Sequence, residues 1–193
     1  MRDRIPVSRR SVIAGAFVPL TSLKSAPKAA LPAPHRKILE AFADRIIPRD
    51  EHSPSASEAG AVEYIDRSLG DYLAPEKPSL RKGLLALDAF AQRVYHAPFA
   101  ELSPGQQDEA LTALESNKAD GFEPDSRTFF QRIRQLTLEG MFGDPFYGGN
   151  RAYAGWDLIR YPGPRLAVSP EEQRIGVEIK PVRASAHGSG HGH

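Results

Sequence analysis

The 193-residue sequence contains no cysteine. This absence excludes disulfide bonds, thiolate zinc sites, cysteine-held iron–sulfur clusters and haem attachment through C-x-x-C-H. An excess of one charge is also missing, because 25 basic and 24 acidic residues give a net charge of +1. This balance argues against a strongly basic nucleic-acid surface. The sequence also lacks three motifs: G-x-G-x-x-G after a strand, G-x-S-x-G and H-E-x-x-H. These are the usual signatures of dinucleotide-binding proteins, serine hydrolases and zinc proteases, respectively.

Histidines and carboxylates do not form a recognisable catalytic set. Three of the six histidines, His187, His191 and His193, lie in the Gly/Ser-rich C-terminal tail, and the carboxylates are scattered along the chain. We therefore predict no catalytic, cofactor-binding or metal-binding residue in this chain. Closely spaced histidines can chelate a metal, so an independent periplasmic enzyme or metal-binding protein that uses the tail stays open as the alternative function.

The N-terminal residues have the pattern of an export signal. In "SRRSVIAGAFVPL", residues 8–20, the pair Arg9 and Arg10 precedes a short apolar run. A twin-arginine signal places two apolar residues shortly after such a pair, and the run is too short for a comfortable membrane span. We predict that residues 1–30 are a twin-arginine signal peptide and linker, and that the protein is periplasmic. Because this pathway carries folded proteins, the signal suggests a cofactor protein or a partner of one.

Apolar residues at helical spacing predict an all-α fold of about five helices in a single domain, residues 31–165. Ser103, Pro104 and Gln106 form the clearest helix start in the sequence. Ser55 and Glu58 have the same capping-box spacing. The apolar faces expected for the five helices are Ile38, Phe42 and Ile46; Val62, Ile65, Leu69 and Tyr72; Leu80, Leu84, Leu87, Ala91 and Val94; Leu111 and Leu114; and Phe129 or Phe130, Ile133, Leu136 or Thr137, and Met141.

An irregular segment rich in glycine, proline and aromatic residues follows Gly143, which is expected to end the fifth helix. Within "GDPFYGGN", residues 143–150, the aromatic residues can either fold back on the fifth helix or contact a partner. We predict that Phe146, Tyr147 and Trp156 lie near one another and that they pack on, or directly support, a partner interface, where the two adjacent glycines let a partner backbone approach.

The last part of the chain, residues 166–193, is predicted to be an extended arm followed by a flexible His/Gly tail. Apolar and polar residues alternate over residues 175–179, which permits either one short strand or an extended segment.

Three stretches together resemble the gluconate 2-dehydrogenase subunit 3 family. They are "LEAFADRIIPRDEHSPSASEAGAVEYIDRSL", "FFQRIRQLTLEGMFGDPFYGGN" and "AGWDLIRYPGP", and the resemblance covers roughly residues 36–165. It implies a non-catalytic small subunit that binds and stabilises a flavoprotein, assists its maturation and provides its twin-arginine signal.

The same resemblance implies two partners. One is an FAD-dependent large subunit of the glucose–methanol–choline type, which oxidises a sugar or an alcohol. The other is a multihaem cytochrome c subunit, which carries electrons towards quinone. The complex as a whole is expected to associate with the inner membrane, and the contacts that select the substrate are expected in the large subunit.

Overall fold

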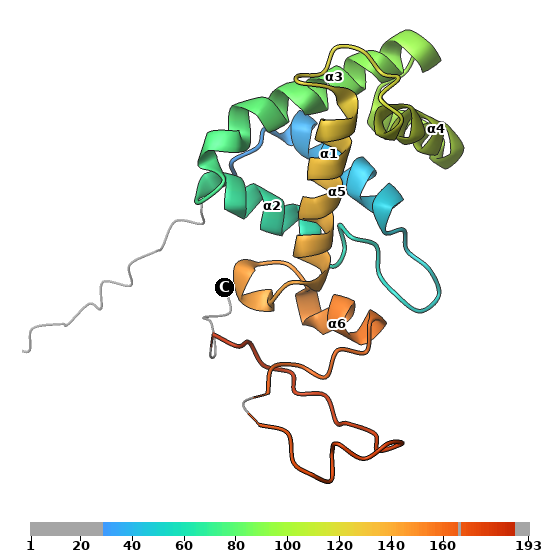
Figure 1. Ribbon diagram of the computed structural model, residues 1–193. Coiled ribbons are helices and arrows are strands. Elements are labelled where there is room, and N and C mark those ends of the chain that lie inside the picture. Colours follow the sequence, from blue (N-terminus) through green and yellow to red (C-terminus); the bar gives the residue numbers. More distant parts are fainter. Residues whose placement is uncertain (1–28, 166, 188–193) are drawn as a thin grey trace, which may run out of the picture.

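The computed structural model describes residues 29–165 and 167–187. In this part the chain is all-helical and has no strand, which confirms the predicted fold class (Figure 1). The α-helices are α1 (Ala33–Ile46), α2 (Ala61–Gly70), α3 (Lys77–Tyr95), α4 (Pro104–Glu115), α5 (Ser126–Phe142) and α6 (Ala154–Leu158). Four short 3-10 helices lie between them: η1 (Ala74–Glu76), η2 (Phe99–Glu101), η3 (Pro145–Tyr147) and η4 (Arg151–Tyr153). None of the described helices is both long enough and apolar enough to cross a membrane.

Helix α5 is central, and it packs against α1, α2 and α4 (Figure 1). Its aromatic residues meet Phe42 of α1: the ring centroids of Phe42 and Phe129 are 6.3 Å apart in an edge-to-face arrangement, and those of Phe42 and Phe130 are 5.7 Å apart. Each fully buried large apolar side chain contributes roughly 1.5–3 kcal/mol. This aromatic contact therefore fixes α5, and with it the loop that follows α5, relative to the rest of the core.

Side-chain caps start helices α4 and α5, and the cap of α4 is the one that the sequence predicts. Ser103 Oγ accepts the backbone N–H of Gln106 at the start of α4, and the Gln106 side chain accepts the Ser103 N–H in return. Asp125 caps α5 by accepting the Thr128 N–H at 2.9 Å. Such caps are worth about 1 kcal/mol each.

The second capping pair belongs to a turn and not to the first turn of α2. Ser55 and Glu58 bond reciprocally as predicted, with Ser55 N–H donating to the Glu58 carboxylate at 2.9 Å. Helix α2 nevertheless begins only at Ala61.

Two predicted core positions are wrong. Tyr72 lies beyond the end of α2 with 57% of its surface exposed, and Val94 of α3 is 48% exposed, whereas Phe90 of α3 is buried. Residues 175–179 do not form the short strand that the alternating pattern permits. Ile175 and Gly176 lie instead in a turn, in which the Val177 N–H donates to the Arg174 carbonyl at 3.3 Å. Helix α6, which the sequence analysis missed, has only five residues and so spans too few turns to show a periodic pattern.

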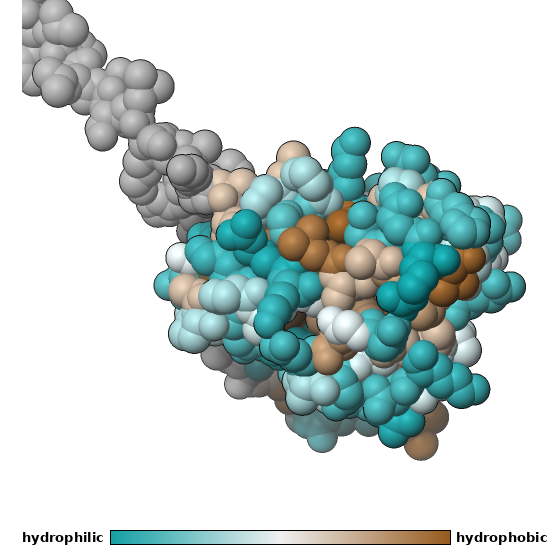
Figure 2. Space-filling view, turned by 90° about the horizontal axis from the view of Figure 1, so that it is seen from above, coloured by the Kyte–Doolittle hydropathy of each residue, from teal (hydrophilic) through white to brown (hydrophobic). Residues whose placement is uncertain are grey.

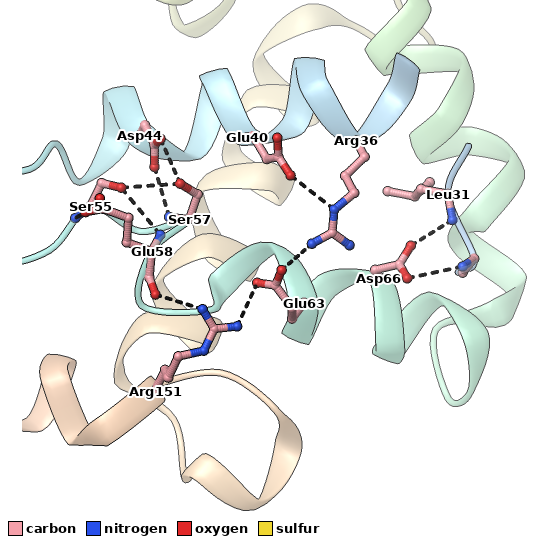
Figure 3. A network of polar contacts seen from close by, with 11 residues as sticks. Leu31, Arg36, Glu40, Asp44, Ser55, Ser57, Glu58, Glu63, Asp66 and Arg151 are labelled. Atoms are coloured by element: carbon pink, nitrogen blue, oxygen red, sulfur yellow. Dashed lines mark hydrogen bonds and ion pairs between the residues drawn. The ribbon is translucent and has the colours of Figure 1, made fainter. Parts of the chain in front are cut away.

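The segment before α1 is held more firmly than the predicted linker implies. Leu31 is buried in the core, and its N–H donates to the Asp66 carboxylate of α2 at 2.7 Å (Figure 3). Ala30 N–H donates to the same carboxylate at 3.2 Å. Packing of Leu31 and these two bonds make residues 30–32 part of the helical domain.

His35 of α1 is buried, and within the described residues neither of its ring nitrogens has a hydrogen-bond partner. Burial, followed by the nearby positive charge of Arg81, lowers the pKa of His35 below its usual value. The unfolded chain therefore binds a proton more readily than the folded chain. The contribution of His35 to stability is fully present above the unfolded pKa of about 6.5 and is lost as the pH falls below it.

We expect His35→Leu to reduce the acid sensitivity of the fold. Melting temperatures measured at pH 7.5 and pH 5.5 should differ less for this variant than for the parent chain, because the variant has no buried imidazole to protonate. His52→Leu removes an exposed histidine and should leave the difference unchanged. An equal difference for His35→Leu and the parent chain would contradict the expectation.

Candidate partner-binding site

The loop that follows α5, residues 143–150, is held by backbone contacts with its own chain. Asp144 accepts the Phe146 N–H at 2.9 Å and so caps η3. Gly148 follows with a φ of 98°, a conformation that favours glycine. Gly149 then passes so close to α5 that a Cβ atom there would overlap the Gly140 carbonyl oxygen. The close approach of Gly149 is therefore internal, in contrast to the prediction that it admits a partner backbone.

Asn150 fastens the loop from inside. Its side chain is fully buried, its Nδ2 donates to the Gly143 carbonyl at 2.9 Å, and its Oδ1 accepts the Gly155 N–H at 2.9 Å. Its own N–H donates to the Gly140 carbonyl at 2.8 Å. Gly155 also lies against α5, because a Cβ atom there would overlap the Met141 carbonyl oxygen. These bonds join the end of α5, the loop and α6 into one unit.

An ion-pair network ties the same loop to α1 and α2 (Figure 3). Arg151 donates to the Glu58 carbonyl at 3.1 Å, and its guanidinium lies 3.8 Å from the Glu63 carboxylate. Arg36 of α1 pairs with Glu63 and also with Glu40, at 3.0 Å. The Arg151 N–H donates to the Ala59 carbonyl at 2.7 Å. The C-terminal end of the loop is thus bonded, through Arg151, to α2 and to the turn that precedes α2, and Glu63 links this contact to α1.

Trp156 supports the loop from within the molecule. The side chain is only 4% exposed, and its indole N–H donates to the Phe142 carbonyl at 2.9 Å. Its ring packs between Tyr153 and Tyr161, with centroid distances of 5.4 and 4.9 Å. Trp156 is therefore not available to present its ring to another protein in this conformation.

Phe146 and Tyr147, in contrast, face solvent. They are 42% and 44% exposed, and their rings meet edge to face with centroids 5.3 Å apart. Of the three residues predicted to form or support an interface, the structure brings these two together at the surface and buries Trp156. The interface role itself stays a prediction.

Tyr72 extends this exposed pair. It lines a small groove together with Phe146, Tyr147 and Arg67. Its hydroxyl is 2.7 Å from the Tyr64 hydroxyl, which donates to Glu139 at 3.0 Å. Burial and these hydrogen bonds raise the pKa of Tyr64, so its hydroxyl keeps its proton. We call Tyr72, Phe146 and Tyr147 the aromatic patch.

Sequence reasoning missed Tyr72 because its spacing continues the apolar face of α2. The signal that was available is Gly70, which is a poor residue for extending a helix and is the last residue of α2. A helix that stops there leaves Tyr72 outside its buried face.

Large apolar side chains are exposed mainly at this end of the molecule. Among the residues that the structure describes, nine of the twelve exposed large hydrophobic residues lie within residues 146–182, and Tyr72 adjoins Phe146 and Tyr147. The other two, Leu85 and Val94, belong to α3. The side of the molecule that carries α3, opposite the segment after α5 in Figure 1, is mostly hydrophilic around a smaller apolar area (Figure 2). The concentration of apolar surface after residue 145 is typical of a protein-binding region.

The described residues contain no group of three or more His, Asp or Glu side chains placed to hold a metal ion. His187 lies against Phe146 and Tyr147. His191 and His193 lie outside the described residues, as do Arg9 and Arg10. In the described residues, this site consists of exposed aromatic side chains, and no acid–base pair or activated nucleophile lies among them.

No match was found among curated proteins or among solved structures. The profile described as "Gluconate 2-dehydrogenase subunit 3" matches residues 33–163, which run from the first turn of α1 through α6 and include the whole loop with Phe146 and Tyr147. The match covers about two thirds of the chain and agrees with the resemblance seen in the sequence motifs. The chain therefore belongs to the gluconate 2-dehydrogenase subunit 3 family.

Proposed function

We propose that this chain is the non-catalytic small subunit of an exported FAD-dependent sugar or alcohol dehydrogenase complex. It binds and stabilises the flavoprotein large subunit of the glucose–methanol–choline type. The observation that carries the proposal is the aromatic patch, whose residues Phe146 and Tyr147 are exposed on a loop that Gly149, Asn150 and Trp156 hold from inside the fold. Membership of a family named as a dehydrogenase subunit supports the same function.

The aromatic patch is suited to binding because its shape is set before a partner arrives. Phe146 and Tyr147 stand on a capped 3-10 helix, and Tyr72 is held by its hydrogen bond to Tyr64. Little conformational entropy is then lost on association. Aromatic side chains at the centre of an interface commonly contribute about 2 kcal/mol or more each.

In this proposal the redox groups belong to the partners. FAD is bound by the large subunit, haem c is bound by a multihaem cytochrome subunit, and the complex associates with the periplasmic side of the inner membrane. This chain contributes the export signal containing Arg9 and Arg10, so that the folded flavoprotein, with its FAD already inserted, is carried across with it.

Purification of the chain alone and together with its flavoprotein tests the proposal. Alone, the chain should be helical by circular dichroism, show no flavin or haem absorbance and have no dehydrogenase activity. Together, the two proteins should elute as one yellow complex, and the flavoprotein should melt at a higher temperature than it does without the small subunit. Stoichiometric flavin on the isolated chain, or separate elution of the two proteins, would contradict the proposal. Metal analysis of the isolated chain tests the alternative use of the tail histidines.

A further inference from the structure

The arm that follows the family-matched region turns back towards the aromatic patch. Beyond α6 the chain runs away from the helices and then returns (Figure 1). The return is fixed where Val182 N–H donates to the Pro162 carbonyl at 2.7 Å, and where Arg165 donates to the Lys180 carbonyl at 2.7 Å. Most of the arm is exposed, and it has no helix or strand in its described residues, 165 and 167–187. Its course is therefore set by these contacts and by a small number of hydrogen bonds within the arm, such as the one from the Ser169 N–H to the Glu172 carboxylate at 3.0 Å.

The end of the arm, residues 183–187, lies on the loop that bears the aromatic patch. Ala186 N–H donates to the Asp144 carboxylate at 2.8 Å. The His187 ring lies 5.1 Å from the Phe146 ring and 5.4 Å from the Tyr147 ring, centroid to centroid, and its Nε2 is 3.2 Å from the Tyr147 hydroxyl. His187 thus occupies the apolar surface that these two residues would offer to a partner.

Asp144 is shared between the loop and the arm. One carboxylate oxygen accepts the Phe146 N–H, and the other accepts the Ala186 N–H. Burial raises the pKa of Asp144, but these bonds and one from Ser185 outweigh it, so the pKa lies below its usual range. The carboxylate is therefore charged at neutral pH and can hold both segments at once.

The contacts of residues 183–187 are too exposed to bind the arm tightly. Arg183 pairs with Asp157 at the surface, and His187 itself remains exposed. Surface ion pairs contribute little to stability because solvent screens them, and a single edge-to-face aromatic contact is also weak. A contact of this size can cover a surface in the free chain and still be displaced by a larger interface.

We propose that residues 183–187 are a built-in competitor, which covers Phe146 and Tyr147 in the free subunit and is displaced when the flavoprotein binds. The inference rests on the proposed function, because it concerns the same aromatic patch. The arm keeps two exposed aromatic residues partly covered until the intended partner, with its greater contact area, replaces it. The apparent affinity for the flavoprotein is reduced by the fraction of chains in which the patch is covered.

A chain that ends at Val182 tests the competition by two independent measurements. The first is nitration of Tyr147 by tetranitromethane, followed by mass spectrometry of the isolated subunit. The second is the affinity of the subunit for the flavoprotein. We expect Tyr147 to react about threefold faster or more, and the flavoprotein to bind about threefold to tenfold tighter, as the loss of a weak covering contact implies.

Single substitutions separate the histidine ring from the rest of the arm. His187→Ala should shift both measurements in the same direction as the shortened chain, and by less. His52→Ala, which changes an exposed histidine in the turn after α1, should shift neither.

The outcomes distinguish this inference from the proposed function. If Tyr147 reacts equally in the full and the shortened chain, the arm does not cover it. If Tyr147 reacts faster but the flavoprotein binds both chains equally, or binds the shortened chain more weakly, the arm is not a competitor. If neither chain binds the flavoprotein, the proposed function is wrong and the competition is wrong with it.

Discussion

Replacement of both Arg9 and Arg10 by lysine is expected to leave this chain and its flavoprotein partner in the cytoplasm. Lysine keeps the positive charge but lacks the planar guanidinium that makes bidentate hydrogen bonds. A hydrogen bond to a charged group is worth about 1.5–3 kcal/mol, so its loss weakens recognition about tenfold or more. Fractionation of cells that produce both proteins, followed by immunoblotting and an activity assay of the periplasm, measures the result.

The matched control changes Arg2 and Arg4 to lysine, which alters the same residue type in the same basic segment outside the pair. Export should then stay near the parent level. If the paired substitution retains this chain in the cytoplasm while the flavoprotein still reaches the periplasm in normal amount, the flavoprotein has its own route. In that case the proposed escort role is wrong, although a binding role in the periplasm would survive.

Phe146→Ala combined with Tyr147→Ala is expected to abolish stable association with the flavoprotein while the isolated subunit melts almost as before. Both side chains are exposed by more than two fifths, so their removal costs the fold little. At the centre of an interface the same two truncations would cost about 4 kcal/mol together, which corresponds to roughly a thousandfold loss of affinity.

Trp156→Ala is expected to have the opposite effect. A buried aromatic residue reduced to alanine destabilises a protein by about 3–5 kcal/mol, and here the Phe142 carbonyl also loses its indole donor. The isolated subunit should melt early, and binding should fall only as far as folding does. This expectation differs from the sequence-based grouping of all three aromatic residues, because burial separates Trp156 from the exposed pair.

The melting temperature and the affinity for the flavoprotein, measured on the same preparations, distinguish an interface role from a role in the fold. Leu85→Ala is the control, because Leu85 is an exposed hydrophobic residue of α3 and lies outside the loop of residues 143–150. This substitution should change neither the melting temperature nor the affinity. Normal affinity of the Phe146/Tyr147 double variant would remove the aromatic patch from the interface. Early melting of that variant would mean that the pair serves the fold.

Much of the fold follows from local chemistry that can be seen in the sequence. The Ser103–Gln106 box and the Asp125 cap depend on residues close together in the sequence, and the Ser103–Gln106 box begins a helix where predicted. The errors occur where a periodic pattern continues past a helix end, as at Tyr72, or meets solvent on its last turn, as at Val94. The periodicity of apolar residues shows which residues share a helix face. How much of that face is buried depends on where the helix ends and on which helices pack against it.

The candidate site was only partly predictable for a related reason. The motif indicated that Phe146 and Tyr147 belong to an unusual turn, but their exposure depends on Asn150, whose side chain bonds to residues seven positions before and five positions after it. No local pattern in the sequence shows a buried asparagine of this kind. The return of His187 to Phe146 is equally hidden, because the two residues are 41 positions apart and neither has a spacing that links them.

Residues 143–155 contain two kinds of position. Gly149 and Gly155 make close main-chain contacts with α5. At these glycines any side chain would strike a carbonyl oxygen, so their identity is set by the shape of the subunit itself. Phe146 and Tyr147 carry no such constraint, because their side chains project from the same backbone into solvent. The backbone of the loop is thus fixed by packing, whereas the side chains at positions 146 and 147 can be replaced without disturbing that packing. Exchange of the two tip residues could redirect the subunit to a different flavoprotein without a new fold.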